Sequence, residues 1–513
     1  MKNQKEVKLY KNRAIIRFEG DDFLGQVGID GRIFKALTLA RISVGVISQQ
    51  AIENGLSILV QSTDSQNAID CLEKEFQKEK EEKKVQSIYS IKEVSVLAFD
   101  CEDYSRLSQE LGRNGVFPLI LSHVASENRV NIVVSSAQDE KAKSIIESEL
   151  FGKPKVVHLA IIGHGNVGGT LIEQVLVSQK EIRRRKNLDL RIVGIANSKK
   201  QIFNPRGINE KWRDELKYSD SESNLEALVS QLQRYQLQNL IAVDNTGSRE
   251  FVKNYPYLVE NGFDIVSSNK IFNTLPIEDY RSLRRLLAKN TKRYLYETNV
   301  GAGLPLIDTI KLLHLSGENI TRIKGVFSGS LSYLFNQFSK GEQAFSEILQ
   351  EAIDKGFTEP DPREDLCGLD VARKLLILAR ELDLENELDD IKIENLIPPS
   401  LRVGSKENFL KRIHEIDSPY EKRRRSLKPG HVLRYVGDLS GDLQKEKGNL
   451  EVKLVEVPTH SPLGQLKGSD SVFEIYTESY REQPIVIMGA GAGAKVTARG
   501  VFGDLLRISE TKQ

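Results

Sequence analysis

Apolar runs of strand length alternate with segments of helical spacing in the middle of this chain. The best defined run covers residues 156–162, ends in Gly163-His164-Gly165-Asn166-Val167-Gly168 and leads into a helical pattern at 170–176. Further strand-length runs lie at 188–196, 240–244 and 263–268. Helical segments separate these runs, so the pattern predicts a parallel, doubly wound α/β sheet.

Two copies of a shorter pattern come before this sheet. The first copy predicts strands at 14–18, 43–48 and 56–60, an Asn54-Gly55 hairpin turn, and helices at 32–40 and 65–79. The second predicts strands at 94–99, 118–122 and 129–134 and helices at 104–113 and 139–150. Val46-Ile47-Ser48-Gln49 in the first matches Ile120-Leu121-Ser122-His123 in the second. Neither copy carries catalytic groups, so this tandem repeat predicts a binding or assembly module, with a plain dimerisation scaffold as the alternative.

The pattern changes again after residue 294. It predicts a glycine-rich corner at 297–305, a strand entering a helix at 323–330, short strands between 391 and 475 with a charged insertion at 406–428, and a strand, glycine-rich turn and helix from 485 to 506. We expect this last segment to return to the doubly wound sheet. The predicted fold is therefore α/β: two ferredoxin-like units (1–85 and 86–153), a Rossmann-like doubly wound domain (154–300, completed by 480–513) and an α+β catalytic or dimerisation domain (301–479).

Composition excludes several classes of protein. Lys and Arg total 73 against 72 for Asp and Glu, so no excess charge attracts nucleic acid or an anionic membrane. The polar opening residues do not predict a signal peptide, and no apolar segment reaches the roughly 18 residues of a membrane span. Cys71, Cys101 and Cys367 are scattered without metal-binding spacing. We expect a globular cytoplasmic protein without a nucleic-acid or membrane partner.

The glycine-rich turn predicts a dinucleotide site. Gly163 permits the tight turn, Gly165 the approach of a pyrophosphate, and Gly168 close packing of the helix, whose first N–H groups at Asn166 and Val167 face the phosphates. A turn without a ligand is the alternative. The next strand ends in Asn197-Ser198-Lys199-Lys200, where NAD-binding proteins carry an acid for the ribose. This favours NADP(H), with NAD(H) as the alternative; the two lysines could also be solvated loop residues.

A polar stretch at 358–370 precedes a predicted helix at 371–380. Asp370 and Lys374 lie four residues apart and share one helix face. Most such pairs are exposed and nearly neutral in energy, and Asp365 could be a helix cap. Five carboxylates from Glu359 to Asp370 beside one lysine could nevertheless bind an ammonium group and retain a proton donor.

Residues 155–513 resemble homoserine dehydrogenases. The resemblance rests on 163–168, Ser268-Asn269-Lys270, 297–305, Ser328-Gly329-Ser330-Leu331-Ser332-Tyr333, 359–374, and Gly491-Ala492-Gly493 with Val496-Thr497-Ala498. It implies reversible, NAD(P)H-dependent reduction of L-aspartate 4-semialdehyde to L-homoserine in threonine, methionine and isoleucine biosynthesis. Lys374 matches the lysine that supplies the proton, and Lys270 a second active-site lysine.

The same resemblance implies further roles. Glu359, Asp365 and Asp370 match substrate-binding acids. The residues of this chain that match the family's cofactor contacts are Thr246, Lys270, Gly491 and Gly493. Gly247 stands where the family usually has a serine. A site for a monovalent cation, Na⁺ or K⁺, matches Glu297 and the backbone carbonyls of Val300, Ala302 and Leu304.

The first 150 residues resemble the paired ACT domains of bifunctional aspartokinase–homoserine dehydrogenases, through Val27-Gly28-Ile29, Ile47-Ser48-Gln49 and Ser57-Ile58. This implies an amino-acid effector such as threonine, with Gln49 as a contact, and a homo-oligomer, dimer or tetramer. The second copy lacks the glycine-rich loop of the first and carries His123 in place of Gln49. Two alternatives remain open: a non-catalytic regulatory partner of a separate aspartokinase, and a related dehydrogenase acting on another small aldehyde.

Overall fold

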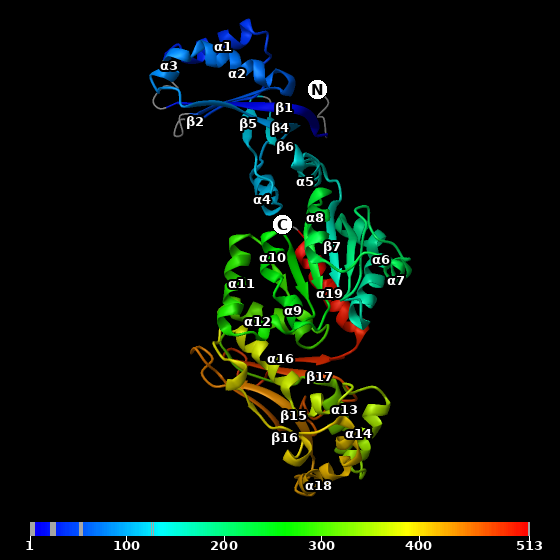
Figure 1. The fold of residues 1–513 in the computed structure, drawn as a ribbon. Coiled ribbons are helices and arrows are strands. Elements are labelled where there is room, and N and C mark those ends of the chain that lie inside the picture. The colour runs from blue at the N-terminus through cyan, green and yellow to red at the C-terminus, as the bar shows by residue number, and fades with distance from the viewer. Residues whose placement is uncertain (1–5, 21–26, 51–54, 125, 127, 511–513) are drawn as a thin grey trace.

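Three six-stranded sheets make up the computed structural model, which describes residues 6–20, 27–50, 55–124, 126 and 128–510 (Figure 1). Figure 1 shows the sheets following one another along the molecule in the order of the sequence. Within these described ranges, we find no helix with the length and apolar character needed to span a bilayer.

The first sheet contains both copies of the tandem repeat, and each has the predicted order of strands and helices. Its elements are β1 (Lys8–Glu19), α1 (Ile29–Leu39), β2 (Ile47–Gln50), β3 (Gly55–Gln61), α2 (Ser65–Glu75), α3 (Gln77–Glu81), β4 (Ser87–Asp100), α4 (Ser105–Arg113), β5 (Ile120–Val124), β6 (Arg129–Ser135) and α5 (Asp139–Phe151). The strand predicted at 43–48 begins only at Ile47, because Gly45 and Val46 make backbone hydrogen bonds to Leu59 outside a regular ladder. The predicted turn at Asn54 lies outside the described residues.

The two copies exchange parts of their first strands. The strand order is β2-β3-β1-β4-β6-β5. Residues 15–19 of β1 pair with 87–91 of β4 beside β3, whereas 8–10 pair with 96–98 beside β6. Accordingly, Val7 packs in the core of the second copy and Ile88 in the core of the first. Each copy is completed by the first strand of the other.

The second sheet is the predicted doubly wound domain, with strand order β12-β11-β10-β7-β8-β9. All neighbours are parallel except β9, which runs antiparallel to β8. Helices α6, α7 and α19 pack on one face, and α8, α10 and α11 on the other. The elements are β7 (Lys155–Ile162), α6 (Asn166–Lys186), β8 (Leu188–Ala196), β9 (Gln201–Phe203), α7 (Trp212–Tyr218), α8 (Leu225–Arg234), β10 (Leu240–Asp244), α9 (Arg249–Val252), α10 (Tyr255–Glu260), β11 (Asp264–Ser267), α11 (Ile277–Lys289) and β12 (Tyr294–Leu295).

The third sheet has the order β14-β16-β15-β13-β17-β18. Its elements are α12 (Leu306–Leu315), β13 (Ile320–Val326), α13 (Gly329–Phe338), α14 (Phe345–Asp354), α15 (Arg363–Leu366), α16 (Leu369–Arg380), β14 (Lys392–Ile393), α17 (Lys406–Lys411), α18 (Asp417–Arg425), β15 (His431–Ser440), β16 (Asn449–Pro458), β17 (Ser471–Thr477), β18 (Ile485–Gly489) and α19 (Ala494–Ser509). The charged insertion at 406–428 is helical. The last strand, β18, pairs with β17 in this sheet, and α19 alone packs against α6 of the nucleotide-binding domain.

Polar contacts join the second copy of the repeat to the nucleotide-binding sheet, at the amino-terminal ends of strands β7, β10 and β12. Asn114, which follows α4, accepts a hydrogen bond from the N–H of Asn239 before β10 (2.6 Å). Lys292, before β12, donates to the carbonyl of Arg113 (2.7 Å), and Lys155 of β7 pairs with Glu110 (3.2 Å). Burial lowers the pKa of Lys292 to about 8. The opposite ends of the same strands lead into the candidate site.

Candidate active site

A cavity of about 680 Å³ lies where the nucleotide-binding domain meets the helices of the third sheet. It brings together predicted residues from three distant parts of the sequence. The first group follows β10 and β11, the second lies on α15, α16 and the loop before them, and the third follows β18. The predicted residues that line it are Thr246, Lys270, Glu359, Asp365, Asp370, Lys374 and Gly491.

Asp370 connects the two predicted lysines. Its carboxylate is 2.8 Å from the Nζ of Lys374, one turn further along α16, and 2.9 Å from the Nζ of Lys270, which follows β11. Lys374 also donates a hydrogen bond to the carbonyl of Phe327 (2.8 Å). The i, i+4 spacing predicted the first pair, and the third residue of the group comes from another domain.

Burial and neighbouring charges shift the pKa values of Lys374 and Asp370 in opposite directions. Burial lowers the pKa of Lys374, Asp370 acts in the opposite direction, and the charge of Lys270 lowers it further. Burial alone would raise the pKa of Asp370, but Lys374 and Lys270 hold it well below its usual range. The group is thus an ionised carboxylate between two amines, one of which releases its proton more easily than a solvated lysine.

The other two predicted acids have different surroundings. Asp365 accepts hydrogen bonds from the hydroxyl of Ser330 (2.6 Å) and from the backbone N–H of Glu359 (2.8 Å). The carboxylate of Asp365 therefore positions these two residues. Glu359 is exposed, and its carboxylate makes no hydrogen bond or ion pair within the described chain. Partial burial and the carboxylates of Asp365, Glu364 and Asp370 raise its pKa, so Glu359 is suited to receiving a cation.

The glycine-rich turn after β7 has the geometry expected of a dinucleotide site. Gly163 has φ +86°, and a Cβ there would lie 2.9 Å from the backbone of Asn245. A Cβ on Gly168 would lie 1.9 Å from the carbonyl oxygen of Gly163, whereas one on Gly165 would meet nothing within 4 Å. Gly165 is the N-cap of α6, and the exposed Asn166 begins the helix. The turn is closely packed beneath and open above, which fits a pyrophosphate at the N-terminus of α6.

The end of β8 departs in part from prediction. Asn197 accepts from the backbone N–H groups of Lys199 and Lys200 (2.7 and 2.8 Å), and its amide lies 2.9 Å from the His164 ring. Lys200 donates its Nζ to the carbonyl of Lys217 (2.8 Å), so its ammonium is already bonded. Ser198 and Lys199 are exposed at the strand end.

The predicted cation residues form a separate group behind α12. Both carboxylate oxygens of Glu297 accept backbone N–H groups of this helix, from Ile307 (2.8 Å) and Asp308 (3.0 Å). Burial, reinforced by Asp308 and Asp504, raises the pKa of Glu297 to about 8. These three carboxylates share one guanidinium, Arg507 of α19. This deficit of positive charge fits a cation. Val300 is buried, Ala302 has φ +54°, and the carbonyl of Leu304 accepts the N–H of Leu306.

Two predicted residues lie outside both groups. Gly493, with φ +114°, is the N-cap of α19 and does not line the cavity. Gln49 is exposed on β2, an edge strand of the first sheet.

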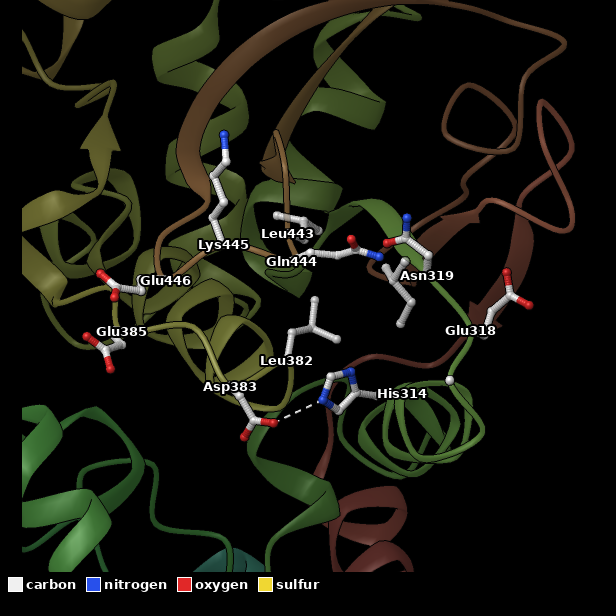
Figure 2. A pocket seen from close by; sticks show the side chains of 12 residues that line it. His314, Glu318, Asn319, Leu382, Asp383, Glu385, Leu443, Gln444, Lys445 and Glu446 are labelled. Carbon is white, nitrogen blue, oxygen red and sulfur yellow. Dashed lines mark hydrogen bonds and ion pairs between the residues drawn. The ribbon is translucent and has the colours of Figure 1, made fainter.

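A second cavity, of about 410 Å³, carries none of the predicted residues. Figure 2 shows the His314 ring turned toward Asp383, to which it is bonded at 3.0 Å, with Leu382 and Leu443 facing the hollow. The ionisable groups around it come from three loops and one helix end. They have no counterpart of the Lys–Asp–Lys group.

Sequence reasoning assigned no role to several residues of the site. Ser328 caps α13, and its hydroxyl lies 2.8 Å from that of Ser330. The His164 ring packs edge-on against Trp212, 5.7 Å away. Arg373 and Glu364 also line the main cavity. The Ser328-Gly329-Ser330 motif was visible in the sequence, but its contact with Asp365 joins residues 35 positions apart, which spacing cannot reveal.

Comparison with known proteins agrees with this arrangement. Family models described as homoserine dehydrogenase and homoserine dehydrogenase, NAD-binding domain match residues 305–506 and 163–297, and an ACT domain model matches 16–76. A bifunctional aspartokinase/homoserine dehydrogenase of Haemophilus influenzae is 35% identical over 506 residues, and one of Arabidopsis thaliana, described as chloroplastic, is 34% identical over 509. Each comparison covers 97% of this chain, which spans 61% and 55% of those relatives.

Solved structures resemble about two thirds of the chain. A Candida auris protein of unknown function is 33% identical, with a TM-score of 0.62, over 69% of this chain and 98% of its own. A putative homoserine dehydrogenase of Archaeoglobus fulgidus is 23% identical, with a TM-score of 0.55, over 69% of this chain and all of its own; at that identity the likeness establishes the fold.

Proposed function

The chain belongs to the homoserine dehydrogenase family, and from this we propose that it catalyses the reversible reduction of L-aspartate 4-semialdehyde to L-homoserine. The observation that carries the proposal is the Lys270–Asp370–Lys374 group, which lies in a cavity shared by the NAD-binding domain and the third sheet. A related dehydrogenase for another small aldehyde would use the same group, so substrate identity rests on the family.

Lys374 is the proton donor in this proposal. When bound, the reduced nicotinamide supplies a hydride to the aldehyde carbon. The carbonyl oxygen then gains negative charge, and the ammonium of Lys374 donates a proton to it. Its lowered pKa favours this transfer, while Asp370 and the carbonyl of Phe327 fix the direction of the amine. Glu359 supplies a free carboxylate for the α-ammonium group of the substrate.

We also propose that the cofactor is NADP(H) rather than NAD(H). The end of β8 offers Asn197, Ser198 and Lys199 and no carboxylate to accept the ribose hydroxyls. A higher kcat/KM with NADP⁺ than with NAD⁺ would support this, and an equal or reversed ratio would contradict it.

A Na⁺ or K⁺ ion at Glu297 is a further part of the proposal. Three carboxylates beside one guanidinium support it, together with the buried hydroxyl of Thr298, which has no hydrogen-bond partner among the described residues. Such an ion would brace the 297–305 corner between α12 and α19.

The ACT-like units support regulation by an amino acid, and we propose threonine binding near Gln49 of the first unit. Inhibition of the full chain by threonine, lost in Gln49→Ala, would support this assignment. We further propose a homo-oligomer, dimer or tetramer, because the edge strand β18 exposes Val486 and Met488. Light scattering of the purified chain tests it.

The central experiment is turnover. Purified protein mixed with L-homoserine and NADP⁺ should form reduced nicotinamide, and Lys374→Ala should lose at least about 100-fold in kcat. Lys253→Ala, which removes an exposed amine paired with Glu250 outside the cavity, is the matched control. No turnover with either nicotinamide would reject the proposal, and capture of an aspartokinase by such an inactive protein would favour the regulatory-partner alternative.

A further inference from the structure

The charged groups of the main cavity are unequally engaged. Asp370 binds both Lys270 and Lys374, and Asp365 is occupied by Ser330 and Glu359. In contrast, the guanidinium of Arg373 makes no hydrogen bond, ion pair or ring contact with any part of the chain that the structure describes. All of its N–H donors are therefore unengaged within the described chain, whereas Lys270 and Lys374 each direct at least one donor to Asp370.

The position of Arg373 is set by its helix. It lies three residues after Asp370 and one before Lys374, so all three project from the same side of α16. The opposite side of α16 is anchored in the core by Ala372, Leu376 and Ala379. Arg373 is half-buried at the cavity wall, beside the proposed proton donor.

The proposed substrates carry a group that this arginine suits. L-Aspartate 4-semialdehyde and L-homoserine both have an α-ammonium and an α-carboxylate that take no part in the reaction. Free carboxylates of Glu359 and Glu364 line the cavity for the ammonium. The α-carboxylate needs donors that are not already engaged, and a guanidinium can bind it through two parallel hydrogen bonds.

We propose that Arg373 binds the α-carboxylate of the substrate and selects amino-acid substrates over simple amino alcohols. This inference rests on the proposed function, because it takes the substrate from it. The other anion that will enter the site is the pyrophosphate of the cofactor, for which the N-terminus of α6 already provides backbone donors.

The test compares two alcohols that differ only in the carboxylate, L-homoserine and 3-aminopropan-1-ol, at saturating NADP⁺. Arg373→Gln should lower kcat/KM for homoserine by about 10- to 100-fold, which is the usual range for losing hydrogen bonds to a charged group. For 3-aminopropan-1-ol it should change kcat/KM by less than about twofold. Arg373→Lys, which keeps the charge without the planar fork, should fall between Arg373→Gln and the wild type on homoserine.

Controls separate the inference from its premise. Arg425→Gln on α18 removes an exposed guanidinium outside the cavity and should leave kcat/KM unchanged for both substrates. An equal loss on both alcohols, or a loss confined to NADP⁺ affinity measured by fluorescence titration, would overturn the role of Arg373 while leaving the dehydrogenase activity in place. No turnover of homoserine by the wild type would overturn the proposed function, and this inference with it.

Discussion

The amine of Lys374 is balanced between burial, which lowers its pKa, and Asp370, which raises it. Aldehyde reduction needs the protonated amine, so kcat in that direction should fall as the pH rises through this pKa. Asp370→Asn removes the carboxylate and should move the falling limb to lower pH by about one unit or more. We would measure kcat between pH 6 and 10 at saturating substrates. A limb that stays in place or moves upward would contradict the assignment.

The raised pKa of Glu297 predicts that the effect of cations on Tm depends on pH. Its pKa is raised to about 8, so the native state binds a proton that the unfolded chain, with a pKa near 4.5, has already lost. That contribution to stability disappears as the pH rises through 8. A bound cation requires the carboxylate, so KCl should raise Tm more at pH 9 than at pH 6.5, relative to tetramethylammonium chloride. Glu297→Gln should abolish the difference, and equal shifts at both pH values would count against a cation site.

Two glycines of the turn after β7 should behave differently. A methyl group on Gly168 would collide with the carbonyl of Gly163, which is backbone and cannot move aside. Gly168→Ala should therefore lower Tm by several degrees or prevent folding. Gly165→Ala meets open space, so its Tm should match the wild type while NADP(H) binds at least about 10-fold more weakly. Thermal unfolding with and without cofactor distinguishes the two effects.

Spacing along one element predicted the site only in part. Asp370 and Lys374 were visible as a pair because one helix carries both. Lys270 reaches Asp370 only because β11 ends beside α16, and Ser330 reaches Asp365 only because α13 and α15 pack together. Such contacts depend on tertiary packing, and here the resemblance to a family supplied Lys270, while nothing in the sequence indicated the contact of Ser330.

Among the elements, the buried apolar strands of the doubly wound sheet were predicted correctly, whereas its strands of two or three residues and the most charged helices were not. The strands β7, β8, β10 and β11 are buried along nearly their whole length, so their sequences are continuously apolar. The two-residue strand β12 and the edge strand β9 have too few residues to show a period. Helices α17 and α18 bury little apart from Phe409 and Tyr420, so their charged sequence resembled a loop.

The chain from β18 to α19 shows why an element's partner is harder to predict than its type. Both elements were expected from the pattern. However, β18 joins the third sheet and α19 crosses to the nucleotide-binding domain, where Asp504 accepts the N–H of Glu297 (2.9 Å). The C-terminal segment therefore links the two domains that form the cavity.

At the scale of the whole molecule, the contact between the second ACT-like unit and the nucleotide-binding sheet is polar and closely fitted. Asn114→Ala would leave the N–H of Asn239 without its partner, at a cost of about 1–3 kcal/mol. We expect a lower calorimetric Tm and unchanged dehydrogenase kcat, with weaker inhibition by an effector that still binds. Gln77→Ala, on the outer surface of the first unit, is the control. An Asn114→Ala protein that matches the wild type in both Tm and inhibition would show that this contact contributes neither to stability nor to the response to the effector.

Because β1 and β4 each extend through both halves of the tandem repeat, the two halves form one structural unit. A fragment that begins at residue 86 would lack Val7 and the strand pairing at 8–10. A fragment that ends at residue 86 would lack Ile88. Neither half therefore contains all of the residues of its own core. A ligand that shifts β1 or β4 in one half would therefore shift a strand that also belongs to the other half. The second half carries His123 where the first has Gln49, and it completes the core of the first half whether or not it binds an amino acid itself.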